Sequence, residues 1–443
     1  MKANKDLFRP RLAVITAAIV TSFSGAAWAA PGDPLGAPIS VVPAQSYTSF
    51  DSAGIGRDAA GNIITIWRAP AGLVARRYKP DGTVNGSDIL IDSNTSPAEV
   101  AMDAAGDFVV AWTRSDAAGA AVHAQRYHAD GTPDGAQLLV NEPSSKTVVQ
   151  GATVAMDDDG DFVVAWEQGR EVRSGNGFAC SYGVGLCTFV GGYSVQLRRY
   201  TGGGTQAQAV QTVDSTAATE ISVMRLILPT GSNEGRVSAA MAPDGRYVVA
   251  WNRVSQGVSL LSGVYTRRYS AGGIGEAKRT VSLQRDEAMP AVAMDANGAY
   301  VVAYRHSTRN SDGIYVRNYP AGLGLGGAEV RVDTSPGSGY VFASPATTMD
   351  AAGNYVVTWH GGGYFDKNSY LRAQRFAAGG GPLGINFDVA AHSSEAVALN
   401  SCDVAMDGDG DFAVIWATTW RDYSSGIFGI GNGRVDLQRY DGP

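Results

Sequence analysis

The sequence predicts an all-β protein built as a single seven-bladed β-propeller, with four antiparallel strands in each blade. Three observations support this fold class. A phrase of the type MDxxGDFVVAW recurs seven times, each copy is followed by two further strand-like phrases, and the last copy lacks a strand that the N-terminus can supply. No segment beyond the N-terminus has sustained helical periodicity.

The repeated phrase is a glycine-centred turn followed by an apolar run that ends in Trp or Tyr. Neighbouring turn glycines are 45, 54, 85, 53, 55 and 57 residues apart. A unit that recurs at this length is typical of an array of supersecondary modules, one for each blade. The turn glycines are Gly61, Gly106, Gly160, Gly245, Gly298, Gly353 and Gly410.

Each unit divides into four short strands, as the second copy illustrates. Its strands are expected at Glu99 to Asp103, Phe108 to Trp112, Ala121 to Tyr127 and Gln137 to Asn141. Glycine in the first turn supplies a positive φ without steric cost, which a tight hairpin needs. The FVVAW run is apolar on both faces, which suits a strand covered by a neighbouring blade on each side.

The N-terminus is expected to close the ring. The seventh blade ends at Tyr440 after only three strands, whereas residues 34–41 (PLGAPISV) resemble residues 382–389 (PLGINFDV), the expected outer strand of the sixth blade. We therefore predict that residues 34–42 form the outer strand of blade 7. That strand would cover an edge that is otherwise exposed to solvent.

The first 29 residues read as a signal peptide: a basic leader, an apolar run from Leu12 to Ala27 and an Ala27-Trp28-Ala29 cleavage pattern. Its removal leaves residues 30–443 as one propeller with a formal net charge of −10. We expect an exported protein, whether secreted, periplasmic or attached to the cell surface. The acidic chain has no basic run, which argues against a nucleic-acid partner. No second apolar run is long enough to span a membrane, and a monomer is the default.

Three cysteines are present. Cys180 and Cys187 are separated by six residues in the segment GFACSYGVGLCTF, and in an exported chain this spacing favours a local disulfide over a metal pair. Cys402 precedes the first strand of blade 7, where we expect a buried free thiol.

The phrases AMDxxGDFVVAW and AQRY resemble repeats of large exported bacterial proteins that are often cell-surface or adhesin-like. This resemblance covers nearly the whole mature chain and implies a propeller exposed outside the cytoplasm. The MDxxG turn also resembles the Asp-box of sialidase-type propellers, but the spacing differs by one residue and the serine is missing. The catalytic residues of sialidases have no match here.

Loops of a propeller fall on two faces. One face carries the MDxxG turns and the short turns between third and fourth strands, and we call it the turn face; the opposite face collects the long irregular loops, and we call it the loop face. Binding usually resides in irregular loops on a rigid scaffold. Residues directly after the second strand, among them Arg68, Glu167, Arg305 and His360, are expected to surround the mouth of the central channel.

Mixed aromatic, basic and acidic side chains on the loop face suit a glycan or a protein ligand, although aromatic residues can also serve only to pack long loops together. The candidate binding residues are Arg68, Glu167, Arg170, Arg305, His306, His360, Tyr364, Trp420, Arg421 and Tyr423.

Two residues recur in six blades each. The Asp of the MDxxG turn is expected to accept hydrogen bonds from turn amides, and the Arg of the third strand is a candidate to pair with the Asp of the preceding blade, as in Asp103 with Arg199. Two turns are richer in acid and offer alternating carboxylates around a glycine, as Ca²⁺ sites do. These candidate calcium ligands, with plain hairpin turns as the alternative, are Asp157, Asp159, Asp161, Asp407, Asp409 and Asp411.

Catalytic signatures are scarce: the chain has five His, no HExxH and no GxSxG in a strand-turn-helix setting. The first interpretation is therefore a non-enzymatic exported binding propeller that recognises a glycan or a protein surface through the loop face. The alternative is a polysaccharide hydrolase or lyase with carboxylates on the same face. The third is a structural or assembly module.

Overall fold

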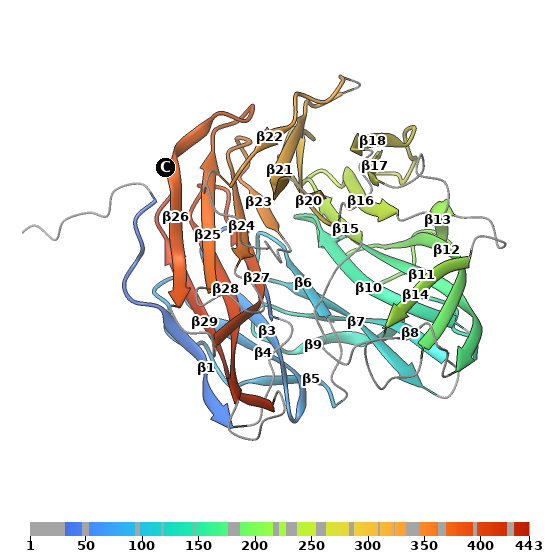
Figure 1. The fold of residues 1–443 in the computed structure, drawn as a ribbon, viewed down its shortest axis with the longest axis horizontal. Helices are drawn as coiled ribbons and strands as arrows, with labels where there is room; N and C mark the ends of the chain where they lie inside the picture. The colour runs from blue at the N-terminus through green and yellow to red at the C-terminus, as the bar shows by residue number, and fades with distance from the viewer. Residues whose placement is uncertain are drawn as a thin grey trace, which may run out of the picture.

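The chain folds into seven antiparallel sheets arranged around a central axis (Figure 1), as the computed structural model shows. It describes residues 32–46, 53–93, 98–116, 119–145, 147–175, 187–215, 221–226, 237–253, 263–282, 288–308, 311–322, 324–333, 345–361, 369–392, 397–422 and 429–442. No helix in these segments is long and apolar enough to cross a membrane. The predicted all-β seven-bladed propeller is confirmed.

The blades follow one another along the chain, and within each blade the strands run outward from the axis in sequence order. Blade 1 comprises β2 (Ala53–Arg57), β3 (Ile63–Ala69), β4 (Gly72–Tyr78) and β5 (Ile89–Asp92). Blade 2 comprises β6 (Ala98–Met102), β7 (Phe108–Asp116), β8 (Gly119–Tyr127) and β9 (Pro133–Leu139). Blade 3 comprises β10 (Thr147–Met156), β11 (Phe162–Gly175), β12 (Cys187–Tyr200) and β13 (Gln211–Ser215). Blade 4 comprises β15 (Val237–Met241), β16 (Tyr247–Arg253), β17 (Gly263–Tyr269) and β18 (Arg279–Ser282).

The last three blades repeat this order. Blade 5 comprises β19 (Ala288–Met294), β20 (Tyr300–Thr308), β21 (Ser311–Tyr319) and β22 (Val330–Arg331). Blade 6 comprises β23 (Ala346–Met349), β24 (Tyr355–Gly361), β25 (Ser369–Phe376) and β26 (Pro382–His392). Blade 7 comprises β27 (Val397–Met406), β28 (Phe412–Asp422), β29 (Gly429–Tyr440) and the N-terminal strand β1 (Ile39–Ser46).

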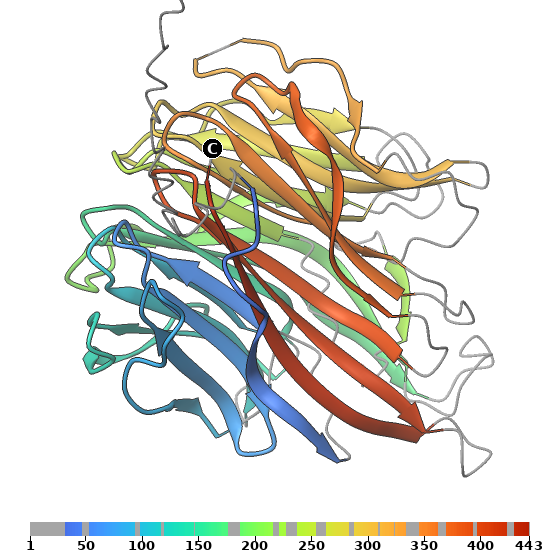
Figure 2. The same cartoon turned by 90° about the vertical axis from the view of Figure 1, so that its left-hand side faces the viewer.

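The N-terminal strand closes the ring as predicted. Strand β1 pairs antiparallel with β29, from Ile39 opposite Leu437 onward (Figure 2), and an isolated bridge joins Pro34 to Tyr440. The strand begins at Ile39 and runs to Ser46, somewhat later than the predicted residues 34–42. Blade 7 thus combines one strand from the N-terminal part of the chain with three strands from its C-terminal part.

Blade 3 departs from the four-strand pattern. An additional strand, β14 (Ile221–Leu226), pairs with the extended part of β12 next to Cys187–Gly191. It comes from the link between blades 3 and 4, whose sequence ISVMRLILP is unusually apolar. Strand β12, which together with β11 is the longest of the described strands, therefore carries this addition toward the loop face.

The core consists of seven apolar clusters, and each one joins two neighbouring blades. Val109 and Ala111 of β7, for example, pack in one cluster with Val154 and Trp166 of blade 3. The second strands are buried on both faces, as their apolar runs predict: every side chain from Phe108 to Trp112 is fully buried. The sheet-to-sheet contact that the repeat encodes is therefore the principal source of hydrophobic stabilisation.

An aromatic pair braces the turn-face end of six blades. The first residue of the second strand stacks on the last residue of the third, with ring centroids 4.6–4.9 Å apart. Stacked pairs of this kind add to the stability that simple burial provides. This geometry explains why the phrases FVVAW and QRY recur together. The pairs are Phe108–Tyr127, Phe162–Tyr200, Tyr247–Tyr269, Tyr300–Tyr319, Tyr355–Phe376 and Phe412–Tyr440.

The recurrent turn Asp has the structural role that its recurrence predicts. In six blades one carboxylate oxygen accepts hydrogen bonds from the amides two and four residues further on, at 2.7–3.2 Å. Asp157 Oδ1, for instance, accepts from the amides of Asp159 and Asp161. The turn amides of blade 4, where Ala242 occupies this position, lack such an acceptor at that residue.

The predicted pairing of the turn Asp with the third-strand Arg of the next blade is wrong. Arg199 binds Asp161 of its own blade at 2.7 Å instead of Asp103. The third-strand Arg does link neighbouring blades, but through backbone carbonyls on the turn face of the following blade: Arg77 donates to Ala129 O at 2.8 Å, and Arg439 donates to Pro80 O. The sequence pattern led to the wrong partner because a backbone carbonyl accepts a hydrogen bond whatever the residue type.

We predict that Asp157→Ala lowers the free energy of unfolding by about 1–3 kcal/mol, because two turn amides lose their acceptor. Asp158→Ala is the matched control: this side chain is exposed in the same turn, and we expect its replacement to change stability by less than about 0.5 kcal/mol. Urea denaturation of both variants measures the difference. Equal effects of the two substitutions would contradict the assigned role.

Candidate functional site

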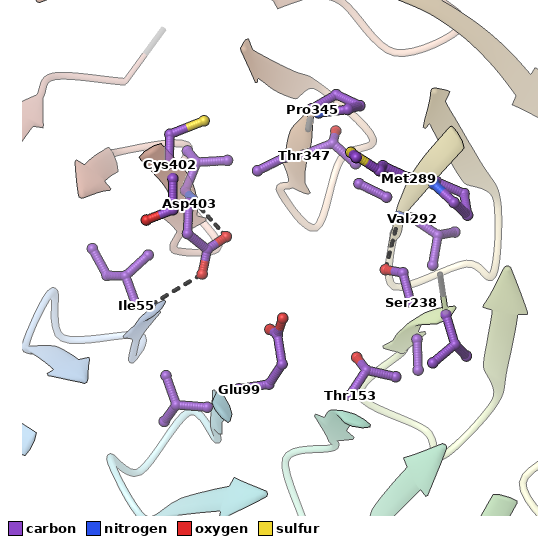
Figure 3. A pocket seen from close by; sticks show the side chains of 18 of the residues that line it. Ile55, Glu99, Thr153, Ser238, Met289, Val292, Pro345, Thr347, Cys402 and Asp403 are labelled. Carbon is purple, nitrogen blue, oxygen red and sulfur yellow. Dashed lines mark hydrogen bonds between the residues drawn. The ribbon is translucent and has the colours of Figure 1, made fainter. Parts of the chain in front are cut away.

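The innermost strands of all seven blades enclose a cavity of about 220 Å³ on the propeller axis (Figure 3). Its walls come from β2, β6, β10, β15, β19, β23 and β27; in the long strands β10 and β27 the lining residues, Thr153 to Val154 and Ser401 to Val404, lie mainly in the second half of the strand. The polar lining residues are Glu99, Thr153, Ser238, Thr347, Ser401, Cys402 and Asp403. The other thirteen of the twenty described lining residues are apolar, although most of the surface that faces the cavity is polar.

Two carboxylates enter this cavity. Figure 3 shows Asp403 of blade 7 and Glu99 of blade 2 directed into the same space, on either side of Ile55 in blade 1. Among the described residues, no Lys, Arg or His contributes to the lining. The described part of the wall is thus acidic.

Asp403 is anchored by the backbone. Its Oδ2 accepts a hydrogen bond from Ile55 N at 3.1 Å, across the junction between the last and first blades, and its Oδ1 accepts from Val404 N at 2.8 Å. Both bonds favour the ionised form, but burial opposes it more strongly and raises the pKa of Asp403 to about 7. The carboxyl therefore exchanges its proton near neutral pH.

Hydroxyl groups occupy other parts of the wall. Ser238 Oγ accepts a hydrogen bond from Val292 N at 3.2 Å, which links blades 4 and 5 as Asp403 links blades 7 and 1. Thr347 Oγ1 donates to Val356 O at 2.9 Å within blade 6. Ser238 still has its own hydrogen to donate, because its oxygen acts as the acceptor in the bond described.

Cys402 is a free thiol, as predicted, but it lies within β27 and not before it, lines the cavity and has intermediate solvent exposure. Its Sγ lies 3.8 Å from Thr358 Oγ1. Burial raises the pKa of the Cys402 thiol to about 12. Since the thiolate is the nucleophilic form, this cysteine is unsuited to nucleophilic catalysis.

Several predicted binding residues lie one strand farther from the axis than the cavity wall. Arg68, Glu167, Arg305 and His360 follow the apolar runs of the second strands, and none of them lines the cavity. Glu167 is only 6% exposed. Burial and the nearby positive charge of Arg305 lower the pKa of His360 to about 4, so the structure brings these two residues of blades 5 and 6 close together.

The remaining binding candidates are spread over the loop face. His306 is buried and packs at a tilted angle on Tyr315, and half-buried Trp420 has the guanidinium of Arg434 5.5 Å from its ring centroid. Arg170 lies in β11 and Arg421 in β28, but their side chains are outside the description. Tyr364 and Tyr423 lie outside the described residues, as do the signal peptide and Cys180 of the predicted Cys180–Cys187 disulfide.

The acid-rich turns use their carboxylates within the fold. Asp161 binds Arg199 and the Gly202 amide, while Asp407 binds Arg57 at 2.8 Å. Within the described segments, no three His, Cys, Asp or Glu side chains converge to hold a metal ion. Calcium binding by Asp157, Asp159 and Asp161, or by Asp407, Asp409 and Asp411, stays a prediction.

Sequence reasoning missed Glu99 and Asp403. Both occupy one repeat position, three residues before the Met that precedes the turn Asp, where the other blades carry small or neutral residues. The residues at this position are Gly54, Glu99, Thr153, Ser238, Ala291, Ala346 and Asp403. An acidic residue in two blades, at a position where the other five blades carry small or uncharged residues, is the sequence signal that could have identified Glu99 and Asp403.

No family model matches the chain, and no curated protein matches its sequence. Similar solved structures include a polysaccharide lyase of family PL25, described as an ulvan lyase (10% identity, TM-score 0.48, 91% of this chain and 94% of that chain). They also include an α-L-arabinanase of Penicillium chrysogenum (11%, 0.43, 92% and 99%) and a Dyadobacter fermentans protein of unknown function (11%, 0.44, 90% and 99%). At this level of similarity no residue role is transferred from them.

We predict that Asp403 makes the protein more stable as pH falls from 7 toward 4. The folded carboxyl, with its raised pKa, keeps a proton that the unfolded chain releases near pH 4, so this contribution is lost as pH rises through 7. Thermal melting of wild type and Asp403→Asn at pH 5 and pH 8 tests this. The variant should lose at least about 1 kcal/mol of the wild-type difference between the two pH values. An unchanged pH dependence would refute the assignment.

Proposed function

We propose that this propeller is a carbohydrate-cleaving enzyme of the hydrolase type, which accepts one sugar residue of a glycan in the central cavity from the loop face. The observation that carries the proposal is the pair of carboxylates, Glu99 and Asp403, in one enclosed space. Glycoside hydrolysis uses two carboxyl groups that flank the scissile bond. The proposal thus favours the alternative of an enzyme over the first interpretation of a binding module.

The two carboxyl groups differ in their surroundings, as a catalytic pair requires. Asp403, whose pKa is raised to about 7, holds a proton that it can donate to the leaving-group oxygen. Glu99 is then the second carboxylate, which either activates water or attacks the anomeric carbon. The hydroxyls of Thr153 and Ser238, on other blades of the same cavity, provide hydrogen-bonding groups for the sugar.

The charge of the cavity favours a hydrolase over a lyase. A lyase that eliminates across a uronate must offset the negative charge of the substrate carboxylate, which calls for a cation beside it. The described lining residues supply two acids and no basic side chain, so these residues are poorly suited to hold a uronate. Neutral or cationic sugars meet no such repulsion.

A second candidate is glycan binding without cleavage. Both oxygens of Asp403 already accept backbone hydrogen bonds, an arrangement that also serves simply to join blades 7 and 1. In that case the cavity and the loop face recognise a sugar and release it unchanged. Export of the protein, which would bring either activity to extracellular glycans, remains a prediction from the N-terminal sequence.

Cleavage is tested on a panel of neutral, amino and uronate polysaccharides by release of reducing ends. We expect hydrolysis without unsaturated products, and a fall of about 100-fold or more in rate for Glu99→Gln and for Asp403→Asn. Wild-type activity should decline above pH 7, as Asp403 loses its proton. Asp158→Asn, an exposed change on the turn face, is the control and should retain full activity.

The outcomes separate the candidates. Unsaturated products would identify a lyase. Binding without cleavage of any polymer would support the binding module, and cleavage that survives both cavity substitutions would place the active site elsewhere.

A further inference from the structure

We propose that Met289 is a specificity-determining residue of the central cavity, which limits the occupant to a sugar ring without bulky substituents. This inference rests on the proposed function and adds to it the size of the sugar that the cavity accepts. Its basis is a strained backbone at a position where another repeat uses glycine, together with the place of the Met289 side chain in the cavity wall.

The backbone at Met289 adopts an unfavourable conformation. Its φ is 61°, in the left-handed region, and among the described residues no other residue apart from glycine has a positive φ. A residue with a Cβ is disfavoured in that region. Pro290 follows, and a residue before proline prefers extended backbone with a negative φ. Met289 is therefore held in a conformation that its own residue type and the following proline both disfavour.

A β-bulge imposes this conformation, and a second blade has the same bulge. The register of β19 with β20 shifts across Met289 and Pro290, and the register of β10 with β11 shifts at Gly151 in blade 3. Gly151 lies five residues before Met156, as Met289 lies five residues before Met294. The φ of Gly151 is 62°. Blade 3 thus forms the bulge with glycine, which adopts a positive φ without strain.

The Met289 side chain is what distinguishes the two bulges, and it reaches the cavity. Met289 lines the cavity, whereas Gly151 does not belong to its described lining. Blade 5, which carries Met289, and blade 2, which carries Glu99, are three blades apart, the greatest separation in a ring of seven. Figure 3 shows the two residues on opposite sides of the same space. An occupant of the cavity therefore lies between Glu99 and Met289.

This arrangement limits the size of the sugar. The cavity of about 220 Å³ is smaller than the roughly 300–1,000 Å³ typical of sites for drug-sized ligands. The side chain of Met289 is among the longest in its wall. A methionine side chain is flexible and apolar, and it packs against apolar surface such as the carbon face of a sugar ring. Between Glu99 and this thioether one ring fits, and an added N-acetyl group does not.

The strain indicates that the side chain has a task. Glycine at this position would form the bulge without strain, as Gly151 does in blade 3. Strained residues that persist in native structures are concentrated at active sites and ligand-binding sites. A methionine that only fills space would contribute to stability alone, whereas a specificity-determining methionine changes the preference among ligands. The two roles are therefore separable by experiment.

The test measures binding of D-xylose, D-glucose and N-acetyl-D-glucosamine to the mature protein by calorimetry at pH 6. The wild type should bind xylose and glucose at least about tenfold more tightly than N-acetylglucosamine. Met289→Gly should reduce this ratio to about threefold or less, because the side chain that excludes the acetamido group is removed. Met289→Leu, which keeps the volume of the side chain, should retain the wild-type ratio.

Gly151→Ala is the matched control for backbone strain. It adds a Cβ to the same bulge in blade 3, so it should lower the melting temperature by about 1–3 °C and leave the ratio of affinities unchanged. Met289→Gly removes strain as well as contacts, and its melting temperature should stay within about 2 °C of the wild type. If Met289→Gly does not fold, Met289→Asn takes its place, since asparagine tolerates the left-handed region.

The same preparations, assayed on the polymer panel, distinguish failure of the inference from failure of the proposed function. An unchanged ratio in Met289→Gly, equal affinity of the wild type for all three sugars, or binding of none of them would overturn the inference. Cleavage of a polymer in any of these cases leaves the hydrolase in place. A preference that depends on Met289, without cleavage of any polymer, would support the inference and remove the hydrolase. Neither binding nor cleavage would overturn both.

Discussion

The structure depends on the closure of a ring. Seven sheets that pack face to face leave the inner edge of each innermost strand facing the axis and without a neighbouring strand, and buried amides at such an edge need acceptors. At two junctions a side chain from the preceding blade provides one: Asp403 for Ile55 N, and Ser238 for Val292 N. The junction between blades 7 and 1 has additional ties, since Arg57 binds Asp407 and β1 completes the sheet of β29.

Contacts between neighbouring blades also explain features of the repeat that lie away from the axis. The Trp that ends the apolar run of the second strand is almost wholly buried, yet its indole N–H needs an acceptor. In blade 2 it donates to Asp92 of blade 1 at 2.8 Å, and in blade 4 Trp251 donates to Asp214 of blade 3 at 3.0 Å. The Asp at or next to the end of these fourth strands is therefore a hydrogen-bond acceptor for the Trp of the next blade.

The fold was predictable because its signals are periodic and local. The spacing of the turn glycines, the runs that are apolar on both faces and the match between residues 34–41 and 382–389 each describe one level of the same architecture. The turn Asp was also predictable, since its bonds reach only four residues along the chain. By contrast, Arg77 binds a backbone carbonyl 52 residues away, and no side-chain pattern records such a partner.

The candidate site was less predictable for a geometric reason. Arg68, Arg305 and His360 stand out in the sequence by residue type, but they lie on second strands, outside the wall of the cavity. The wall consists of innermost strands, which look uniform in sequence. Only comparison of one repeat position across seven blades makes Glu99 and Asp403 conspicuous.

That position also shows why the charge of Asp403 calls for an explanation beyond the fold. Ser238 performs the same task at the junction of blades 4 and 5 with a neutral hydroxyl, so accepting an amide across a junction does not require a carboxylate. Burial raises the pKa of Asp403, which means that its charge is unfavourable where it lies. A group that destabilises the fold when ionised, at a position where serine suffices, is typical of a residue retained for chemistry with a ligand.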